Sequence, residues 1–246
     1  MDMNQGYASP GYEQAHMPVQ TPPQLTNTVP LAVAVIVGMG LMTLATLLML
    51  GVGLIDIAAL REANMQGGLE YFDTKAFEIR NGVAGLLYMG SFLLTIVLFM
   101  VWTFNVTKNA RELTSDGSNF SPGWSVGWYF IPFANLVKPY QIMRNVWNAS
   151  VDPSDWENKA GAGVVKFWWT MWILMTVADR VIGRLWPDDN TEIEMFVAMA
   201  LGLKVLMLVT NVVAITFVWK LSKLQTQWLN TAEPVWTPAD NPYSQS

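Results

Sequence analysis

Long apolar segments alternate with polar loops over most of the chain. Residues 31–55 and 83–104 contain no charged side chain. Each is at least as long as the ~20 residues that an α-helix needs to cross the hydrocarbon core of a bilayer. Residues 164–185 and 195–219 reach the same length but include charged side chains. The pattern predicts an all-α integral membrane protein, a bundle of about four transmembrane helices.

Polar tails flank the predicted membrane domain, residues 31–228. Residues 1–30 are rich in Pro and Gln and lack Lys and Arg, and residues 229–246 are also rich in Pro. Such segments cannot bury enough apolar surface to offset the entropy lost on ordering, so both tails are predicted to be disordered. A cleavable signal peptide opens with a basic region, which this chain lacks. We therefore expect the first apolar segment to be a retained anchor.

The segment between the second and third predicted helices, residues 120–150, has two dissimilar halves. The first half, residues 124–133, is apolar and aromatic but too short to cross a bilayer. Residues that interrupt helices lie in and beside it: Pro122, Gly123, Gly127 and Pro132. We predict a short re-entrant-like or interfacial segment; the sequence leaves open whether it dips into the bilayer or lies on it.

The second half of this segment has the spacing of an amphipathic helix. Apolar and polar side chains recur on opposite faces: Leu136, Tyr140, Met143 and Trp147 on one, Lys138, Gln141, Asn145 and Asn148 on the other. Asn135 is the expected N-cap, and Pro139 is tolerated because it falls near the first turn. We predict that this helix lies in the membrane interface, packed on the bundle or on the lipid surface. A partner-binding helix is the alternative.

Composition and charge support a membrane location. Hydrophobic residues make up 52% of the 246 residues and charged residues 13%, about half the charged fraction of a soluble domain. The net charge of −5 argues against nucleic acid as a partner, because phosphate binding needs a basic surface.

Lys and Arg are more numerous between the second and third segments and after the fourth than on the opposite side. For the inner-membrane protein that we expect, this bias predicts that both termini lie in the cytoplasm.

Charged residues inside or beside the predicted helices form a candidate buried polar site: Asp179, Lys204, Arg180 and Asp56. At ~1.5 Å per residue, Lys204 lies ~13 Å along the fourth helix from Met195. Charges at such depth usually face a partner or water. One interpretation is an ion-pair or proton-coupled site that faces a polar cavity. The alternatives are a structural salt bridge between neighbouring helices and a lysine that extends to the interface.

Residues 120–150 also contain a run of short motifs: Pro-Gly-Trp, Gly-Trp-Tyr-Phe-Ile-Pro, Asn-Leu, Lys-Pro-Tyr and Trp-x-x-Ser. Their positions are Pro122, Gly123 and Trp124; Gly127, Trp128, Tyr129, Phe130, Ile131 and Pro132; Asn135 and Leu136; Lys138, Pro139 and Tyr140; Trp147 and Ser150; with Trp102 and Asn109 upstream. This run resembles the signature of a bacterial membrane family called domain of unknown function 4328. The resemblance extends from about residue 83 to residue 172. It implies a membrane topology and, because the family is uncharacterised, no activity.

Motifs that carry chemistry are missing from the sequence. It contains no cysteine, a single histidine (His16), and no metalloprotease, nucleophile-elbow or phosphate-loop motif. We therefore predict no enzyme activity, cofactor or metal site. The leading hypothesis is a non-enzymatic membrane interaction or scaffold protein, with a membrane or cytoplasmic protein as partner in addition to the bilayer. A solute or ion pathway through Asp179 and Lys204 is the alternative, and an intramembrane enzyme is a third.

Overall fold

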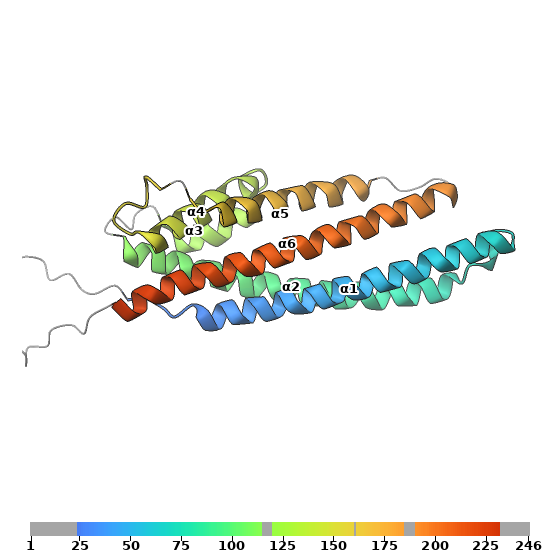
Figure 1. The fold of residues 1–246 in the computed structure, drawn as a ribbon, viewed down its shortest axis with the longest axis horizontal. Coiled ribbons are helices and arrows are strands. Elements are labelled where there is room, and N and C mark those ends of the chain that lie inside the picture. Colours follow the sequence, from blue (N-terminus) through green and yellow to red (C-terminus); the bar gives the residue numbers. More distant parts are fainter. Residues whose placement is uncertain (1–23, 115–119, 160, 185–189, 232–246) are drawn as a thin grey trace, which may run out of the picture.

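The computed structural model shows the chain as an elongated bundle of helices (Figure 1). It describes residues 24–114, 120–159, 161–184 and 190–231, with the backbone alone for residues 190–194, 230 and 231. These ranges form helices and contain no strand, which confirms the predicted all-α class. The elements, with η for a 3-10 turn, are α1 (Val29–Gln66), η1 (Leu69–Tyr71), α2 (Thr74–Leu113), α3 (Pro122–Gly127), η3 (Trp128–Phe130), η4 (Ala134–Leu136), α4 (Lys138–Val151), α5 (Gly163–Ile182) and α6 (Asn190–Thr231).

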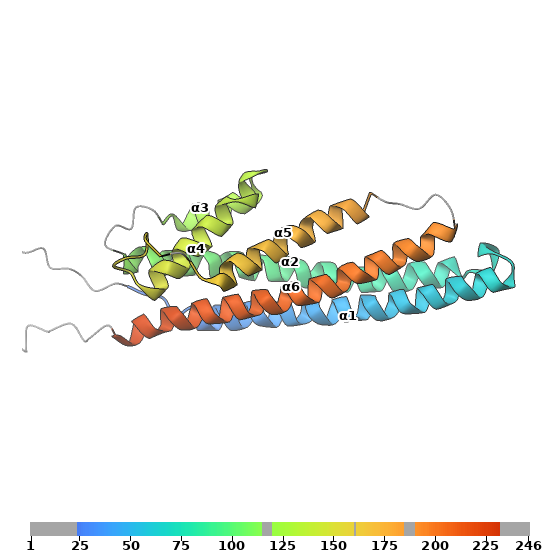
Figure 2. The same cartoon turned by 45° about the horizontal axis from the view of Figure 1, so that its top comes forward.

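Two helix pairs form the body of the bundle (Figures 1 and 2). α1 pairs with α2, α5 pairs with α6, and α6 also packs along α1. The short helices α3 and α4 pack on α2, at the end of the bundle where α1 begins and α6 ends. We call this end the signature end, because it brings residues 120–150 together with the beginning of α1 and the end of α6.

The turn between α1 and α2 is specified by local sequence. Pro30 lies in the first turn of α1, where its missing N–H removes no helical hydrogen bond. α1 ends at Gln66, and the next residue, Gly67, has a φ of 127°, a conformation that favours glycine. The Asp73 carboxylate then accepts a hydrogen bond from the Ala76 N–H (2.9 Å) and caps α2. Backbone chemistry therefore fixes where the chain reverses.

Small and polar side chains set how closely the long helices approach. A Cβ at Gly38 of α1 would lie 2.9 Å from Thr95 Oγ1 of α2, so glycine is needed for the observed spacing. Asn211 of α6 donates from Nδ2 to Met39 O (3.0 Å) and to Thr43 Oγ1 (2.8 Å), both in α1. Buried amides of this kind hold helices together where no water competes for the bond.

The main apolar cluster lies at the signature end. Its buried members are Ala32, Val35, Met39, Phe99, Trp102, Val106, Ala110, Phe120, Met143, Val146, Ala149, Trp156, Val165, Trp168, Trp169, Ala214, Phe217, Val218 and Leu221. Farther along the bundle, α1 and α2 expose large apolar side chains, among them Leu44, Leu54, Leu86 and Val97. A surface of that kind suits hydrocarbon rather than water.

Among the described residues, three helices are long and apolar enough to cross a membrane: α1, α2 and residues Met195–Leu229 of α6. The structure thus supports a membrane protein. The predicted third span corresponds to α5, whose 20 residues would extend ~30 Å. It is not among the helices that are long and apolar enough to cross, and it carries Lys166, Asp179 and Arg180 within its 20 residues.

Three of the helices continue beyond the apolar runs that predicted the spans. Hydropathy marks where a helix can meet lipid, whereas backbone hydrogen bonding continues until a cap or a turn ends it. The predicted spans 31–55, 83–104 and 195–219 therefore lie within the longer helices α1, α2 and α6. α5 instead ends at Ile182, a little before the predicted residue 185.

Both predicted disordered tails include residues that are helical or bonded to the bundle in the structure. Residues 24–30 were assigned to a disordered segment, but α1 begins at Val29, Thr28 is buried, and Thr26 is hydrogen-bonded to Asn109. At the other end α6 continues to Thr231. The remainder of both predicted tails lies outside the described residues. Contacts with the bundle order the residues next to α1. Composition alone does not reveal such contacts.

Candidate functional site

The signature segment folds as a helical hairpin, residues 121–151, which we call the α3–α4 hairpin. The Ser121 hydroxyl accepts a hydrogen bond from the Trp124 N–H (3.4 Å) at the start of α3, and Pro122 lies in the first turn. The chain then turns through η3 and η4 into α4 (Figure 2). The prolines and glycines that predicted an interrupted helix thus lie in a short helix and the turns that follow it.

The tip of this hairpin, residues 128–137, exposes apolar side chains around a strained turn. The Ala134 N–H donates to Pro132 O (2.8 Å) across Phe133, whose φ and ψ are 64° and −42°. This γ-turn holds a non-glycine residue in a sparsely populated region, at a cost of about 1–3 kcal/mol. Phe133 is 85% exposed. Its exposed apolar neighbours are Phe130, Ile131, Leu136 and Val137.

The other face of the tip is anchored to α2 and α5. Trp169 of α5 donates from Nε1 to Leu136 O (3.0 Å). The Tyr129 ring packs edge-on against Phe99 of α2 and Trp169, with centroids 6.1 and 6.5 Å apart. Burial raises the pKa of the Tyr129 hydroxyl, whose oxygen has no hydrogen-bond partner among the described residues. The bundle therefore holds the strained turn in place from one side.

α4 packs on the bundle, with Met143 and Val146 fully buried and contacts to α2, α5 and α6. Asn148, predicted on the polar outer face, is buried as well. Its Nδ2 donates to Trp156 O (3.0 Å) and Lys159 O (2.9 Å), which folds the following loop back over the helix. The prediction for Asn148 was wrong because a polar side chain was expected to face solvent. In the structure two backbone carbonyl groups of the loop accept the hydrogen bonds of its amide instead.

The predicted start of this helix was also wrong. Asn135, the expected N-cap, lies in η4, and α4 begins at Lys138 after Val137, with no capping side chain. Leu136, expected on the apolar face, precedes the helix and is exposed. Pro139 does lie in the first turn, as predicted. The γ-turn at the tip and η4 delay the start of α4.

A buried hydrogen-bond network ties the start of α1 to α2 and α6. Asn109 of α2 accepts from the Thr26 N–H (2.9 Å) at Oδ1 and donates from Nδ2 to Thr26 O (2.8 Å). The same Nδ2 donates to Gln225 Oε1 (3.0 Å) of α6. Asn109 is 0% exposed, so these bonds replace water completely.

Gln225 extends the network to α4. Its Nε2 donates to Val106 O (2.9 Å) of α2 and to Ser150 Oγ (3.1 Å) of α4. Trp228 of α6 donates from Nε1 to Ser150 O (2.7 Å). Every polar atom of the Asn109 and Gln225 side chains is therefore paired, which is the condition for a buried polar network to stabilise a fold.

An aromatic cluster lies next to this network. Phe217 of α6 stacks on Trp168 (centroids 4.6 Å apart) and lies near-parallel to Trp147 (6.3 Å). Trp102 of α2 meets Phe217 edge-on (5.7 Å) and donates from Nε1 to Ser222 Oγ (2.8 Å). Trp102 thus combines ring packing with a satisfied N–H group.

Most residues of the buried network, the aromatic cluster and the hairpin lie in the part of the sequence from α2 to the end of α6. The profile of a protein family described as "Domain of unknown function (DUF4328)" matches residues 66–225. The chain belongs to this family. The match runs from the last residue of α1 to Gln225, so the buried network and the α3–α4 hairpin are largely within the DUF4328 region. The resemblance inferred from the motifs of residues 120–150 is confirmed.

The signature residues of this DUF4328 member serve two structural purposes. Trp102, Asn109 and Ser150 belong to the buried network and the aromatic cluster, and Lys138 lies over the Trp128 ring at 5.7 Å. The rest lie along the α3–α4 hairpin, in α3, in the tip and in the first turn of α4: Pro122, Gly123, Trp124, Gly127, Pro132, Asn135, Pro139 and Tyr140, with Trp147 beside Phe217. No curated protein and no solved structure matches this DUF4328 chain.

The structure brings together only two of the four predicted buried charges. Lys204 of α6 lies 5.7 Å from the Tyr88 ring centroid of α2 and interacts electrostatically with Asp179 of α5. Among the described residues no direct ion pair joins Lys204 to Asp179. Asp179 and Arg180 are exposed, contrary to the prediction of a buried site. In Figure 2 the last turns of α5 rise away from α1 and α2.

Asp56 lies in a separate cluster. Its carboxylate accepts from Arg80 Nη2 (2.6 Å) and from Asn81 Nδ2 (2.7 Å), both in α2, and Asp56 is 2% exposed. The structure shows no bond from Asp56 to Arg180 or Lys204 among the described residues. Asp56 thus forms a salt bridge between the neighbouring helices α1 and α2, with Arg80, a partner that the sequence did not predict. Across the same part of the chain, no three His, Cys, Asp or Glu side chains gather at metal-binding distance.

Three polar residues of α6 were missed by sequence reasoning: Asn211, Ser222 and Gln225. Buried residues on α6 continue at helical spacing past the predicted end of the span at residue 219, with Val218 and Leu221 preceding Ser222 and Gln225. That spacing was present in the sequence and would have placed both polar side chains on the buried face.

Proposed function

We propose that this DUF4328 member is a non-enzymatic membrane scaffold that engages a protein partner through the tip of the α3–α4 hairpin. The observation that carries the proposal is the γ-turn at Phe133. Strained backbone of this kind is retained where the surroundings over-determine it, and such sites cluster where proteins bind or switch. Here the bundle anchors one face of the tip and leaves an apolar face exposed.

The proposal includes a topology of four spans, with α5 as the third in chain order and both termini in the cytoplasm. α5 is long enough to cross and packs along α6. The Lys and Arg residues are more numerous at the signature end, which then faces the cytoplasm. The tip lies beside Phe99 and Trp169, each about five residues, or ~7 Å, inside the cytoplasmic end of its proposed span. A partner would bind at the cytoplasmic side of the membrane, at the level of the inner leaflet.

Photo-crosslinking at position 133 tests the proposal. With a photoreactive residue at Phe133, we expect discrete protein adducts after irradiation of intact membranes. The control is the same residue at Phe104, which is 42% exposed on α2 and is expected to yield lipid adducts. If position 133 gives only lipid adducts, as position 104 does, the tip is not a protein-binding surface and the proposal fails.

Two substitutions at Phe133 separate strain from surface chemistry. Phe133→Gly relieves the positive φ and is expected to raise the free energy of unfolding by about 1 kcal/mol, after the added chain entropy of glycine is subtracted. Phe133→Ser keeps the strain and removes the ring, so the free energy of unfolding should change by less than about 0.5 kcal/mol. Both should reduce partner recovery in membrane particles. Phe104→Ser should not.

A pathway for ions or small solutes is the second candidate, favoured by Lys204, Tyr88 and Asp179 meeting across three helices. Because the chain lacks cysteine, single cysteines can report water access. In intact cells we expect Lys204→Cys to react with a membrane-impermeant thiol reagent at least about tenfold more slowly than Asn64→Cys, at an exposed position in the last turn of α1. Ser154→Cys, on the cytoplasmic side, should react only after permeabilisation. Equal rates at positions 204 and 64 would favour the pathway.

A further inference from the structure

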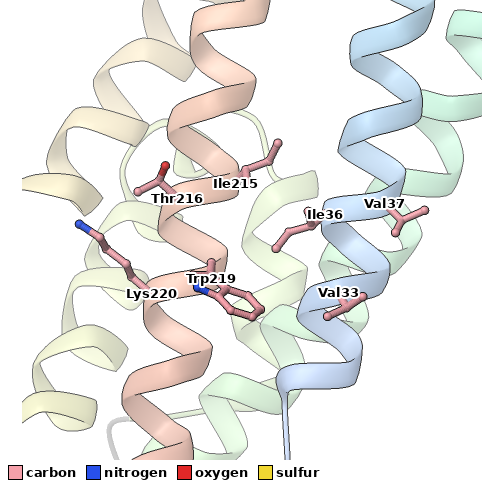
Figure 3. Close-up of a pocket in the computed structure, with 7 residues that line it drawn as sticks. All are labelled: Val33, Ile36, Val37, Ile215, Thr216, Trp219 and Lys220. Atoms are coloured by element: carbon pink, nitrogen blue, oxygen red, sulfur yellow. The ribbon is translucent and has the colours of Figure 1, made fainter.

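A groove of about 420 Å³ lies between α1 and α6 near the signature end. Figure 3 shows its lining: Val33, Ile36 and Val37 from α1, and Ile215, Thr216, Trp219 and Lys220 from α6. The wall is apolar apart from the Thr216 hydroxyl and the Lys220 ammonium. Val37 is 57% exposed, so the groove opens to the surroundings of the bundle.

The occupant of this groove in a membrane is constrained by the helices that form it. Both α1 and α6 are long and apolar enough to cross a bilayer, and the groove lies on their outer surface. Water cannot form hydrogen bonds with valine and isoleucine side chains. An acyl chain can pack against them without losing a hydrogen bond. A hydrocarbon chain is therefore the occupant that suits the apolar part of the groove.

Positive charge lies at the cytoplasmic end of the groove under the topology proposed above. Lys223 is held over the Trp219 ring with its Nζ 4.8 Å from the centroid. In Figure 3 the stem of Lys220 lies along the flank of α6 opposite α1, with its ammonium group pointing away from α1. Residues 24–44 and 205–231 contain no Asp or Glu, so no acidic side chain of these segments neutralises the two lysines.

We propose that the α1–α6 groove binds an anionic phospholipid, with one acyl chain between the two helices and the phosphate at the level of Lys223 and Lys220, whose positive charge attracts it. Basic pockets between transmembrane helices on the cytoplasmic side have the charge that such headgroups need. A tryptophan at the same level suits the interface between hydrocarbon and headgroups. The inference is independent of the partner-binding role of the hairpin tip.

A second groove supplies an internal comparison. It has a volume of about 480 Å³ and lies between α1 and α2, lined by Leu41, Leu44, Ala45, Leu48, Leu86, Leu87, Gly90, Ser91 and Leu94. No charged side chain lines it. Any lipid bound there would be retained without regard to headgroup charge.

The experiment is a lipid titration of delipidated full-length protein, read by native mass spectrometry. Phosphatidylglycerol and phosphatidylcholine with identical acyl chains are compared as probes. We expect a phosphatidylglycerol adduct that survives dilution better than the phosphatidylcholine adduct. Lys220→Gln with Lys223→Gln should weaken it, by about fivefold for each lysine. The control Lys108→Gln with Lys166→Gln removes the same charge from exposed positions of α2 and α5 at the same end.

Filling the groove tests the acyl-chain contact separately. Val37→Trp keeps both lysines and should remove the preferential phosphatidylglycerol adduct, while Leu44→Trp in the second groove should leave it. Equal retention of both lipids by the unmodified protein would overturn the proposal. So would an equal loss in the two lysine double variants, which would indicate diffuse attraction. A dimer that dissociates on Val37→Trp would assign the groove to a second copy of the chain instead.

Discussion

Replacing Phe217 with alanine is expected to lower the free energy of unfolding by about 3 kcal/mol, measured by equilibrium unfolding in mixed micelles. Phe217 is 0% exposed and contacts Trp168, Trp147 and Trp102 within one cluster. Removal of its ring leaves a cavity enclosed by rigid rings that cannot collapse to fill it. Lipid cannot repair the loss, because packing contacts rather than transfer from water hold helices together in a membrane.

The matched substitution is Phe104→Ala on α2. Phe104 is 42% exposed and stacks on no other ring of the described residues, so lipid can occupy the space that its ring leaves. We expect a change below about 1 kcal/mol. If Phe217→Ala and Phe104→Ala destabilise the protein equally, the aromatic cluster does not contribute to stability as the structure indicates.

Asn109→Ala is the second substitution with a large expected effect, again a loss of about 3 kcal/mol. It removes three buried hydrogen bonds and leaves Gln225 Oε1 and both backbone groups of Thr26 without their partner. Each buried group left unpaired costs about 1–3 kcal/mol, less where water can reach it. The free energy of unfolding gives the total, and amide hydrogen exchange at Thr26 reports the local part. We expect exchange at Thr26 to become faster.

Asn105→Ala is the control, one helical turn earlier in α2. Asn105 is only half-buried, and its Nδ2 donates to Val101 O within the same helix (2.8 Å). Removing that bond should cost less than about 1 kcal/mol and leave exchange at Thr26 unchanged. Slow exchange at Thr26 in the Asn109→Ala variant would mean that Asn109 does not hold the residues before α1.

The sequence was sufficient for the long helices because a run without charge has few alternatives to a membrane-spanning helix. It was insufficient for their ends. Asp56 closes the first apolar run, yet α1 continues for ten further residues to Gln66, since Arg80 and Asn81 satisfy the carboxylate. A charge that finds partners on the next helix does not interrupt a backbone, and such pairing is invisible to hydropathy.

The candidate site was predicted in location but not in detail. Residues 120–150 were singled out by their aromatic motifs, and the structure places them on one hairpin. The γ-turn at Phe133 was unforeseeable, because phenylalanine has no preference for positive φ. Asn148 was assigned to the wrong environment because periodicity reports which side chains share a face and says nothing about a loop that returns over it. Tertiary contacts decided both positions.

The bonds of Asn109 also constrain the order in which the protein can be completed during synthesis. Thr26 precedes the first helix, Asn109 lies at the end of the second, and Gln225 lies at the end of α6, the last described helix. A ribosome releases these residues in that order, with nearly the whole membrane domain between the first and the last. Until α6 is in place, Asn109 has only one of its two partners, Thr26. A chain that ends before α6, or in which α6 is not inserted, therefore lacks the bond from Asn109 Nδ2 to Gln225 Oε1, and the signature end stays incomplete until the last helix arrives.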